Sequence, residues 1–141
     1  MTTAITRLSG AEAYDLIYPD YFAKLPELDQ ETMKRSMANS SRVWVGYDGG
    51  KVLCCWGLIV PTLLSDRAYL WLYTTDHMKE YVFTFVRQSQ RIVAEILEDF
   101  PNIVGHCSLA SPKSMRWLRW LGAEFGDPQG PVIPFIIKAK P

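Results

Sequence analysis

The sequence predicts a single α/β (α+β) domain over residues 1–141, with six to seven strands and about four helices. Its 141 residues are enough for one domain with a core and too few for two comfortable ones. Residues 42–47 alternate as a strand does, and the Asp-Gly-Gly that follows them favours a tight hairpin. Residues 78–100 carry apolar side chains at spacings of three and four, the period of a helix buried on one face.

The first part of the chain predicts one strand and two helices. Residues 5–8 form a short strand candidate. Residues 11–23 have the apolar spacing of a helix, although Pro19 must break or kink it. Residues 28–39 predict a second, short amphipathic helix.

Three strands follow, and we expect them to form an antiparallel meander. The strand at residues 42–47 places three apolar side chains on one side and Trp44 on the other. The hairpin leads into residues 51–60, which are apolar on both faces, as expected in the middle of a covered sheet. After a loop at residues 61–66, residues 69–73 predict the third strand.

The longest predicted helix covers residues 78–100 and follows a short polar break. Thr75 or Asp76 can cap its first turn by accepting a backbone N–H. Pro101 stops it, because proline cannot continue a helix. A strand, a tight break and a helix start leave free N–H groups that point at any bound group. The function therefore depends on what binds at this helix start.

The end of the chain predicts a strand at residues 102–107 and a helix at residues 111–121. A proline suits the first position of this helix and a glycine its end. Residues 123–125 are short and strand-like, and residues 132–137 predict the last strand. Pro134 crosses that strand and implies an edge or a bulge, because proline has no N–H for the sheet.

Composition and charge argue against several classes of function. The formal net charge is zero, which argues against a protein that binds the phosphate backbone of nucleic acid. The longest apolar run, residues 52–64, is too short to span a bilayer, and the first ten residues have no apolar signal core. Three cysteines, two of them adjacent, do not make a disulfide framework and indicate buried, reduced thiols in cytoplasm.

The order of these elements resembles the GNAT fold of the acetyl-CoA-dependent N-acyltransferases over essentially the whole chain. In that family the last helix often reads Asn-x-x-Ala-x-x-Leu-Tyr-x-x-Leu-Gly-Phe. The resemblance implies a mixed, mostly antiparallel sheet in one GNAT-like domain. In this chain the positions of that motif are occupied by Ser111, Ser114, Trp117, Leu118, Leu121 and Gly122.

Two further features look most like a set of small GNAT-like proteins of tailed phages. They are the ending Leu-Gly-Ala-Glu-Phe at residues 121–125 and the aromatic-rich strand before the long helix. Some of those phage proteins are internal virion or morphogenesis proteins. The resemblance implies a location in the host-cell cytoplasm or the virion, and a phage virion protein or a host protein as partner.

The chain departs from the family pattern at three positions that commonly serve the cofactor or catalysis. GNAT enzymes usually carry Arg/Gln-x-x-Gly-x-Gly/Ala between the strand and the long helix, whereas residues 74–80 contain no glycine. Asp76 adds a negative charge there. Leu118 stands where a tyrosine often protonates the leaving thiolate, and Ser111 replaces the asparagine before that helix. The resemblance therefore predicts a degenerate acetyl-CoA site.

If the chain were an active enzyme, the resemblance would assign catalysis and cofactor binding to a small set of residues. His77 or a water would act as base, and Tyr73 could supply a hydroxyl in the cleft. Simpler interpretations are a partly exposed histidine at a helix start, a core tyrosine and, for Ser111, a helix cap. The cofactor would be acetyl-CoA or none, and we expect no metal site. The predicted cofactor-binding residues are Tyr73, Thr74, Thr75, Lys79, Ser111, Lys113 and Arg116.

The helix at residues 111–121 also carries an unusual group of basic and tryptophan side chains. Arg and Trp often anchor protein interfaces, so this group favours a protein partner or a homodimer. The simpler interpretation is that the tryptophans pack in the core and the charges are solvated. The group consists of Lys113, Arg116, Trp117, Arg119 and Trp120.

Three hypotheses follow for the function. The first is a phage-type GNAT-fold protein with a degenerate acetyl-CoA site, acting through protein binding in virion assembly or on a host component. The alternative is an active acetyl-CoA-dependent N-acetyltransferase. A third is a ligand sensor, which requires a pocket free of the Trp71 and Tyr73 side chains.

Overall fold

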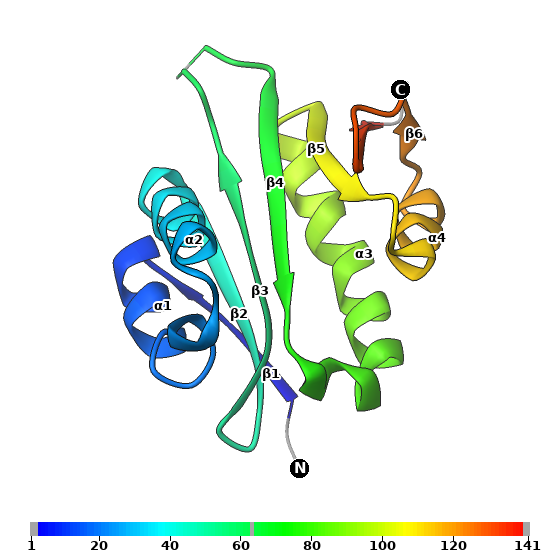
Figure 1. Ribbon diagram of the computed structural model, residues 1–141. Helices are drawn as coiled ribbons and strands as arrows, with labels where there is room; N and C mark the ends of the chain where they lie inside the picture. Colours follow the sequence, from blue (N-terminus) through cyan, green and yellow to red (C-terminus); the bar gives the residue numbers. More distant parts are fainter. Residues whose placement is uncertain (1–2, 63, 140–141) are drawn as a thin grey trace. The chain divides into compact units, whose positions relative to one another are not determined.

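Seven strands form one sheet in the order β1-β2-β3-β4-β5-β7-β6, accompanied by four α-helices and two short 3-10 helices (Figure 1). The computed structural model describes residues 3–62 and 64–139, without the side chains of residues 3, 4, 76, 79 and 82. The elements are β1 (Thr3–Leu8), α1 (Gly10–Ile17), η1 (Phe22–Lys24), α2 (Glu27–Asn39), β2 (Arg42–Asp48), β3 (Lys51–Ile59), β4 (Arg67–Thr74), η2 (Asp76–Glu80), α3 (Val82–Asp99), β5 (Asn102–Ser108), α4 (Pro112–Trp120), β6 (Glu124–Phe125) and β7 (Val132–Lys138).

The sheet is mixed and mostly antiparallel, as predicted. The β1–β2, β2–β3, β5–β7 and β6–β7 pairs are antiparallel. The β4–β5 pair is parallel, with a register that runs from Arg67 opposite Asn102 to Tyr69 opposite Val104. The predicted α/β class, the number of helices and the number of strands are thus confirmed.

The chain divides into two compact units. Unit 1 comprises Met1–Ile59 and Trp71–Tyr81, and unit 2 comprises Val60–Leu70 and Val82–Pro141. Strand β4 contributes its first half to unit 2 and its second half to unit 1. The organisation of residues 1–141 as one domain stays a prediction. No helix in the described part of the chain is long and apolar enough to cross a membrane.

The core of unit 1 lies where α1, η1 and α2 pack on strands β2 and β3. Ser9 and Glu12 close a reciprocal capping box at the start of α1. The predicted break at Pro19 is confirmed, because α1 ends at Ile17 and the chain resumes as η1. The fully buried apolar side chains of this core are Ala13, Ile17, Phe22, Met37, Val43, Val45, Val52 and Cys55.

In unit 2, α3 buries Ile92, Val93 and Ile96 along one side. Pro134 is predicted to mark an edge or a bulge, but β7 lies between β5 and β6, and its register with β5 runs without a shift from Asn102 opposite Lys138 to Ser108 opposite Val132. The Pro134 carbonyl accepts the Gly126 N–H at 3.0 Å, so this proline faces the side of β6. Strand β6 ends at Phe125, immediately before that position. Because Pro134 has no N–H, it cannot donate a further hydrogen bond toward β6. It therefore stands where the β6–β7 hydrogen bonds end and not between them.

Gly10 permits the close approach of α1 to α2. A Cβ atom at this position would overlap the backbone carbonyl of Met37. We predict that Gly10→Ala lowers the free energy of unfolding by about 2 kcal/mol or more, since the obstacle is backbone that cannot rotate away. Urea unfolding measures the change. Ala11→Ser, at the exposed neighbouring position, is the control, and an equal unfolding midpoint for both variants would contradict the packing.

Candidate functional site

The predicted site residues fall into both units. Those in unit 1 lie at the end of β4 and in η2: Tyr73, Thr74, Thr75, His77 and Lys79. Those in unit 2 lie at the start of α4 and within it: Ser111, Lys113 and Arg116. The side chain of Lys79 lies outside the described part of the structure.

Thr75 is buried, and its two hydrogen-bond donors are both bonded to β3. Its amide N–H donates to the Leu53 carbonyl at 2.9 Å. Its hydroxyl donates to the Val52 carbonyl at 2.7 Å and approaches the Leu53 carbonyl at 3.2 Å. Of the two predicted helix caps, Thr75 makes no side-chain cap bond, and the side chain of Asp76 lies outside the described part of the structure.

The turn after Thr75 is a 3-10 helix, η2, so the long helix begins later than predicted. The Met78 N–H donates to the Thr75 carbonyl at 3.1 Å, and the Tyr81 N–H donates to the Met78 carbonyl at 2.9 Å. The α-helix α3 starts only at Val82. These N–H groups are thus used within the turn, in the i to i+3 pattern of a 3-10 helix.

Tyr73 and His77 both lie against aromatic residues that precede or begin η1. The Tyr73 ring meets Phe22 edge-on, with centroids 5.1 Å apart, and His77 meets Tyr21 edge-on at 6.1 Å. Tyr73 packs against the unit 1 core, as the simpler interpretation expected, and His77 is half-buried. Trp71 packs against the same core, which counts against the sensor hypothesis.

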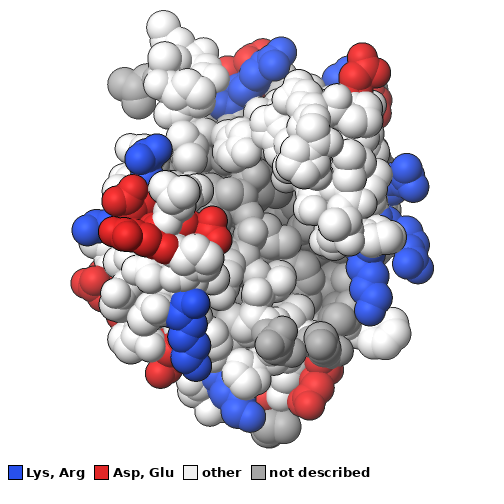
Figure 2. Space-filling view, in the orientation of Figure 1, with Lys and Arg blue, Asp and Glu red and all other residues white. Residues whose placement is uncertain are grey.

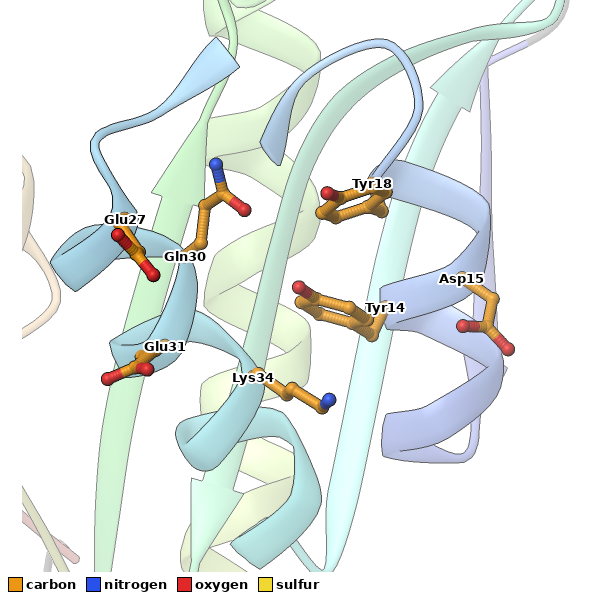
Figure 3. A pocket seen from close by; sticks show the side chains of 7 residues that line it. All are labelled: Tyr14, Asp15, Tyr18, Glu27, Gln30, Glu31 and Lys34. Atoms are coloured by element: carbon orange, nitrogen blue, oxygen red, sulfur yellow. The ribbon is translucent and has the colours of Figure 1, made fainter. Parts of the chain in front are cut away.

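A hollow of about 490 Å³ lies between α1 and α2, and no motif in the sequence indicated it. Tyr14 contacts both Tyr18 and Phe22, with ring centroids 5.5 and 5.6 Å apart. Figure 3 shows the two tyrosine hydroxyls pointing toward α2, and Lys34 reaching from α2 toward Tyr14. The sequence feature that could have pointed to this hollow is the spacing of four between Tyr14 and Tyr18, which places both side chains on one side of a helix.

This hollow has an acidic rim. Asp15, Glu27 and Glu31 line it together with Gln30, and Lys34 is its one basic residue. The Gln30 amide donates to the Leu25 carbonyl at 2.8 Å and so fixes the end of η1 to α2. Figure 2 shows acidic side chains gathered over α2. In Figure 3, Asp15 and Glu31 point away from the tyrosine rings.

In unit 2, the predicted residues of α4 are mostly exposed. Ser111 occupies the cap position of α4, but its hydroxyl bonds to the Ser114 hydroxyl at 2.8 Å and makes no cap bond. Lys113 and Arg116 are exposed, and Figure 2 shows basic side chains over α4. The structure leaves the charges of both side chains in solvent.

The two tryptophans of α4 have different environments. The Trp117 indole N–H donates to the Ser89 hydroxyl at 3.0 Å, and its ring lies 5.4 Å from Phe85. Trp120 is 51% exposed. Trp117 is thus part of the packing between α4 and α3, as the simpler interpretation expected, and only Trp120 remains available to a partner.

Besides the hydrogen bonds of Thr75, a second side-chain hydrogen bond connects the end of η2 to the β2–β3 hairpin. The Tyr81 hydroxyl donates to the Asp48 carboxylate at the end of β2. Asp48 is 2% exposed, and its other carboxylate oxygen has no hydrogen-bond partner among the residues that the structure describes. The hydrogen bond to Asp48 and the nearby negative charge raise the pKa of Tyr81 to about 12.

The cysteines and metal ligands offer no reactive centre in the described part of the chain. Cys54, Cys55 and Cys107 are free and buried, and burial raises the pKa of each thiol. A buried, protonated thiol is a poor nucleophile. Among the described residues, no three His, Cys, Asp or Glu side chains are grouped to hold a metal ion.

No protein-family model matches the chain, and no curated protein matches its sequence. Solved structures do resemble it. The N-acetyltransferase PseH of Campylobacter jejuni, in complex with acetyl coenzyme A, has a TM-score of 0.65 at 10% identity, covering 99% of this chain and 100% of that one. The fold is the GNAT fold.

Two further structures show the same GNAT fold. The IAA acetyltransferase of Bacillus cereus has a TM-score of 0.71 at 9% identity, covering 98% of this chain and 100% of that chain. The dodecameric spermidine N-acetyltransferase of Vibrio cholerae has a TM-score of 0.62 at 14% identity, covering 96% and 93%. Identities this low show a shared fold and leave the activity to be argued from the site.

Several described donors of the turn after β4 are already bonded within the protein, which bears on whether a diphosphate could bind there. A diphosphate needs several free N–H groups that point at it. Here the N–H groups of Thr75, Met78 and Tyr81 are bonded within the protein, and so is the Thr75 hydroxyl. No glycine between residues 74 and 80 lets the backbone approach a ligand closely. The N–H and hydroxyl of Thr75 are thus bonded to β3, and its assignment to cofactor binding stays a prediction.

Thr75→Val tests the importance of the buried hydroxyl, because valine keeps the shape and removes the donor. We predict a loss of about 1–2 kcal/mol in the free energy of unfolding, since the β3 carbonyls lose a buried partner. Thr74→Val at the exposed neighbouring position is the matched control, with a predicted change below about 0.5 kcal/mol. Urea unfolding of both variants measures this difference, and equal losses would refute the role of Thr75.

The raised pKa of Tyr81 gives a pH dependence with a definite sign. Its pKa in the folded protein is about 12, against 10.0 in the unfolded chain, so folding favours the neutral phenol. The stability from this pair is complete below pH 10.0 and is lost as the pH rises toward about 12. Tyrosinate absorbance should therefore lose one late-titrating tyrosine in Tyr81→Phe, while other tyrosines whose pKa burial raises, such as Tyr69, still titrate late.

Asp48→Asn is the matched control for this titration. Asparagine still offers a carbonyl oxygen to the Tyr81 hydroxyl but removes the negative charge, so the late titration should move back toward 10.0. If Tyr81→Phe shows as many late-titrating tyrosines as the wild-type chain, the assignment to Tyr81 is wrong.

Proposed function

We propose that this GNAT-fold protein acts by binding another protein and does not use acetyl-CoA in the standard way. The observation that carries the proposal is the turn after β4. Its Thr75 amide and hydroxyl are bonded to β3, and residues 74–80 contain no glycine. Leu118, where the family often has a tyrosine, is 3% exposed and has no group that could protonate a thiolate.

The exposed side of α4 supports a protein partner. Lys113, Arg116 and Trp120 are exposed on this helix, and Trp and Arg commonly anchor interfaces. The resemblance to phage proteins supports a partner in virion assembly or a host component, with the protein in the host cytoplasm or the virion. A homodimer is a further proposal, and light scattering at increasing concentration tests it.

An active N-acetyltransferase is the second candidate. It is favoured by the solved structures of the same fold, which are N-acetyltransferases, one of them in complex with acetyl coenzyme A. In this chain His77 or a water would then be the base, and Tyr73 lies in the same unit as His77. The two candidates differ in whether acetyl-CoA binds and whether its thiol is released.

Isothermal titration with acetyl-CoA separates the two candidates. We predict no saturable heat, corresponding to a dissociation constant weaker than about 1 mM, because the N–H groups of Thr75, Met78 and Tyr81 are bonded within the protein and the turn has no glycine. The folded state of the sample is checked by urea unfolding in the same buffer. A micromolar dissociation constant would refute the degenerate-site proposal.

A thiol-release assay against a panel of amines and peptides is the complementary measurement. The proposed function predicts no release above the rate of hydrolysis without protein. If release is seen, a Tyr73→Phe, His77→Gln double variant identifies its origin. Loss of the release in that variant would establish the second candidate.

A further inference from the structure

A second hollow, of about 440 Å³, lies on one face of the unit 2 sheet. Strands alternate their side chains, and one face of β5 and β7 buries residues such as Ile103, Phe135 and Ile137. The residues between them face the hollow. Its walls include Tyr69, Val104, His106, Phe125, Pro134 and Ile136.

A phenol and an imidazole form a hydrogen-bonded pair in this hollow. The Tyr69 oxygen lies 3.2 Å from Nδ1 of His106, and the ring centroids are 5.8 Å apart. Burial raises the pKa of Tyr69, so its phenol keeps its proton at neutral pH; the direction of the bond depends on the His106 tautomer, and we assign the phenol as the donor. Nδ1 of His106 then accepts, and a neutral imidazole must carry its proton on Nε2. The pair presents an N–H donor to a ligand.

Arg67 adds positive charge to the same hollow. Its Nε lies 3.8 Å from the Asp66 carboxylate, which is too far for a hydrogen bond, and both side chains are more than half exposed. Glu124, the acidic residue of the lining, lies 3.8 Å from the Lys138 ammonium. Exposed pairs of this kind are weak, so the guanidinium retains donors for a carboxylate.

We propose that this hollow binds a small, largely apolar carboxylic acid. The carboxylate accepts from Nε2–H of His106 and from Arg67, and the apolar part lies against Val104, Pro134 and Ile136. The volume is within the range of small-molecule sites, and apolar walls with a few convergent polar groups are typical of them. The proposal does not depend on the function proposed above, since all these residues belong to unit 2.

The composition of the chain makes a direct test possible. The protein has two histidines, and His77 in unit 1 serves as an internal reference. The probe is 3-phenylpropionate, titrated while the imidazole signals of the whole chain are followed by NMR and assigned with His77→Gln. We expect saturable shifts at His106 and none at His77. The nitrogen shifts should also show the Nε2–H tautomer of His106 before any ligand is added.

Matched ligands and variants identify the contacts. The amide 3-phenylpropanamide should bind about tenfold more weakly than the acid, because it lacks the charge that Arg67 and His106 recognise. Tyr69→Phe should weaken binding by a similar factor and abolish the tautomer preference. Tyr21→Phe, which changes the ring beside His77, should leave both unchanged.

Three outcomes would overturn the proposal. One is the absence of saturable shifts up to roughly 10 mM acid, an affinity too weak for a built site. Another is equal binding of the acid and the amide, or equal shifts at the two histidines. The third is an Nδ1–H tautomer of His106 in the free protein, which the wild-type chain reports even if Tyr69→Phe fails to fold.

Discussion

The hydrogen bonds of Thr75 to β3 are the constraint on which the position of the turn η2 after β4 depends. A buried hydroxyl must find an acceptor, and this one takes the Val52 carbonyl of the neighbouring strand. It makes no cap bond, and the chain continues as the 3-10 turn η2. Tyr81, bonded to Asp48, then holds the far end of that turn. Both ends of η2 are tied to strands β2 and β3.

The fold could be predicted wherever the signal is local. The hairpin after Asp48 needs two residues with positive φ, and Gly49 and Gly50 adopt φ values of 54° and 84°. The break at Pro19 is equally local. The start of α3 could not be predicted, because it depends on whether Thr75 bonds to η2 or to β3. The interior position of Pro134 depends on the strand order, which one stretch of sequence does not contain.

The candidate sites depend still more on contacts between distant residues. Tyr73 and His77 could be identified as candidates from their position after a strand, but their partners Phe22 and Tyr21 lie about fifty residues earlier. Tyr69 and His106 meet only because β4 and β5 pair in parallel. Neither the acidic hollow nor the phenol–imidazole pair has a sequence motif. A periodic pattern predicts which face of an element is buried, and it says little about which elements share that face.

The GNAT fold and the GNAT activity make different demands on a chain. Structures with identities as low as 9% share this fold, because a backbone path needs only a pattern of apolar side chains and turns. A diphosphate site needs particular N–H groups to be free. The Thr75 N–H is bonded to the Leu53 carbonyl through the backbone alone, so replacing side chains by glycine would not release it. The Thr75 N–H would become free for a ligand only if the path of the chain after β4 changed.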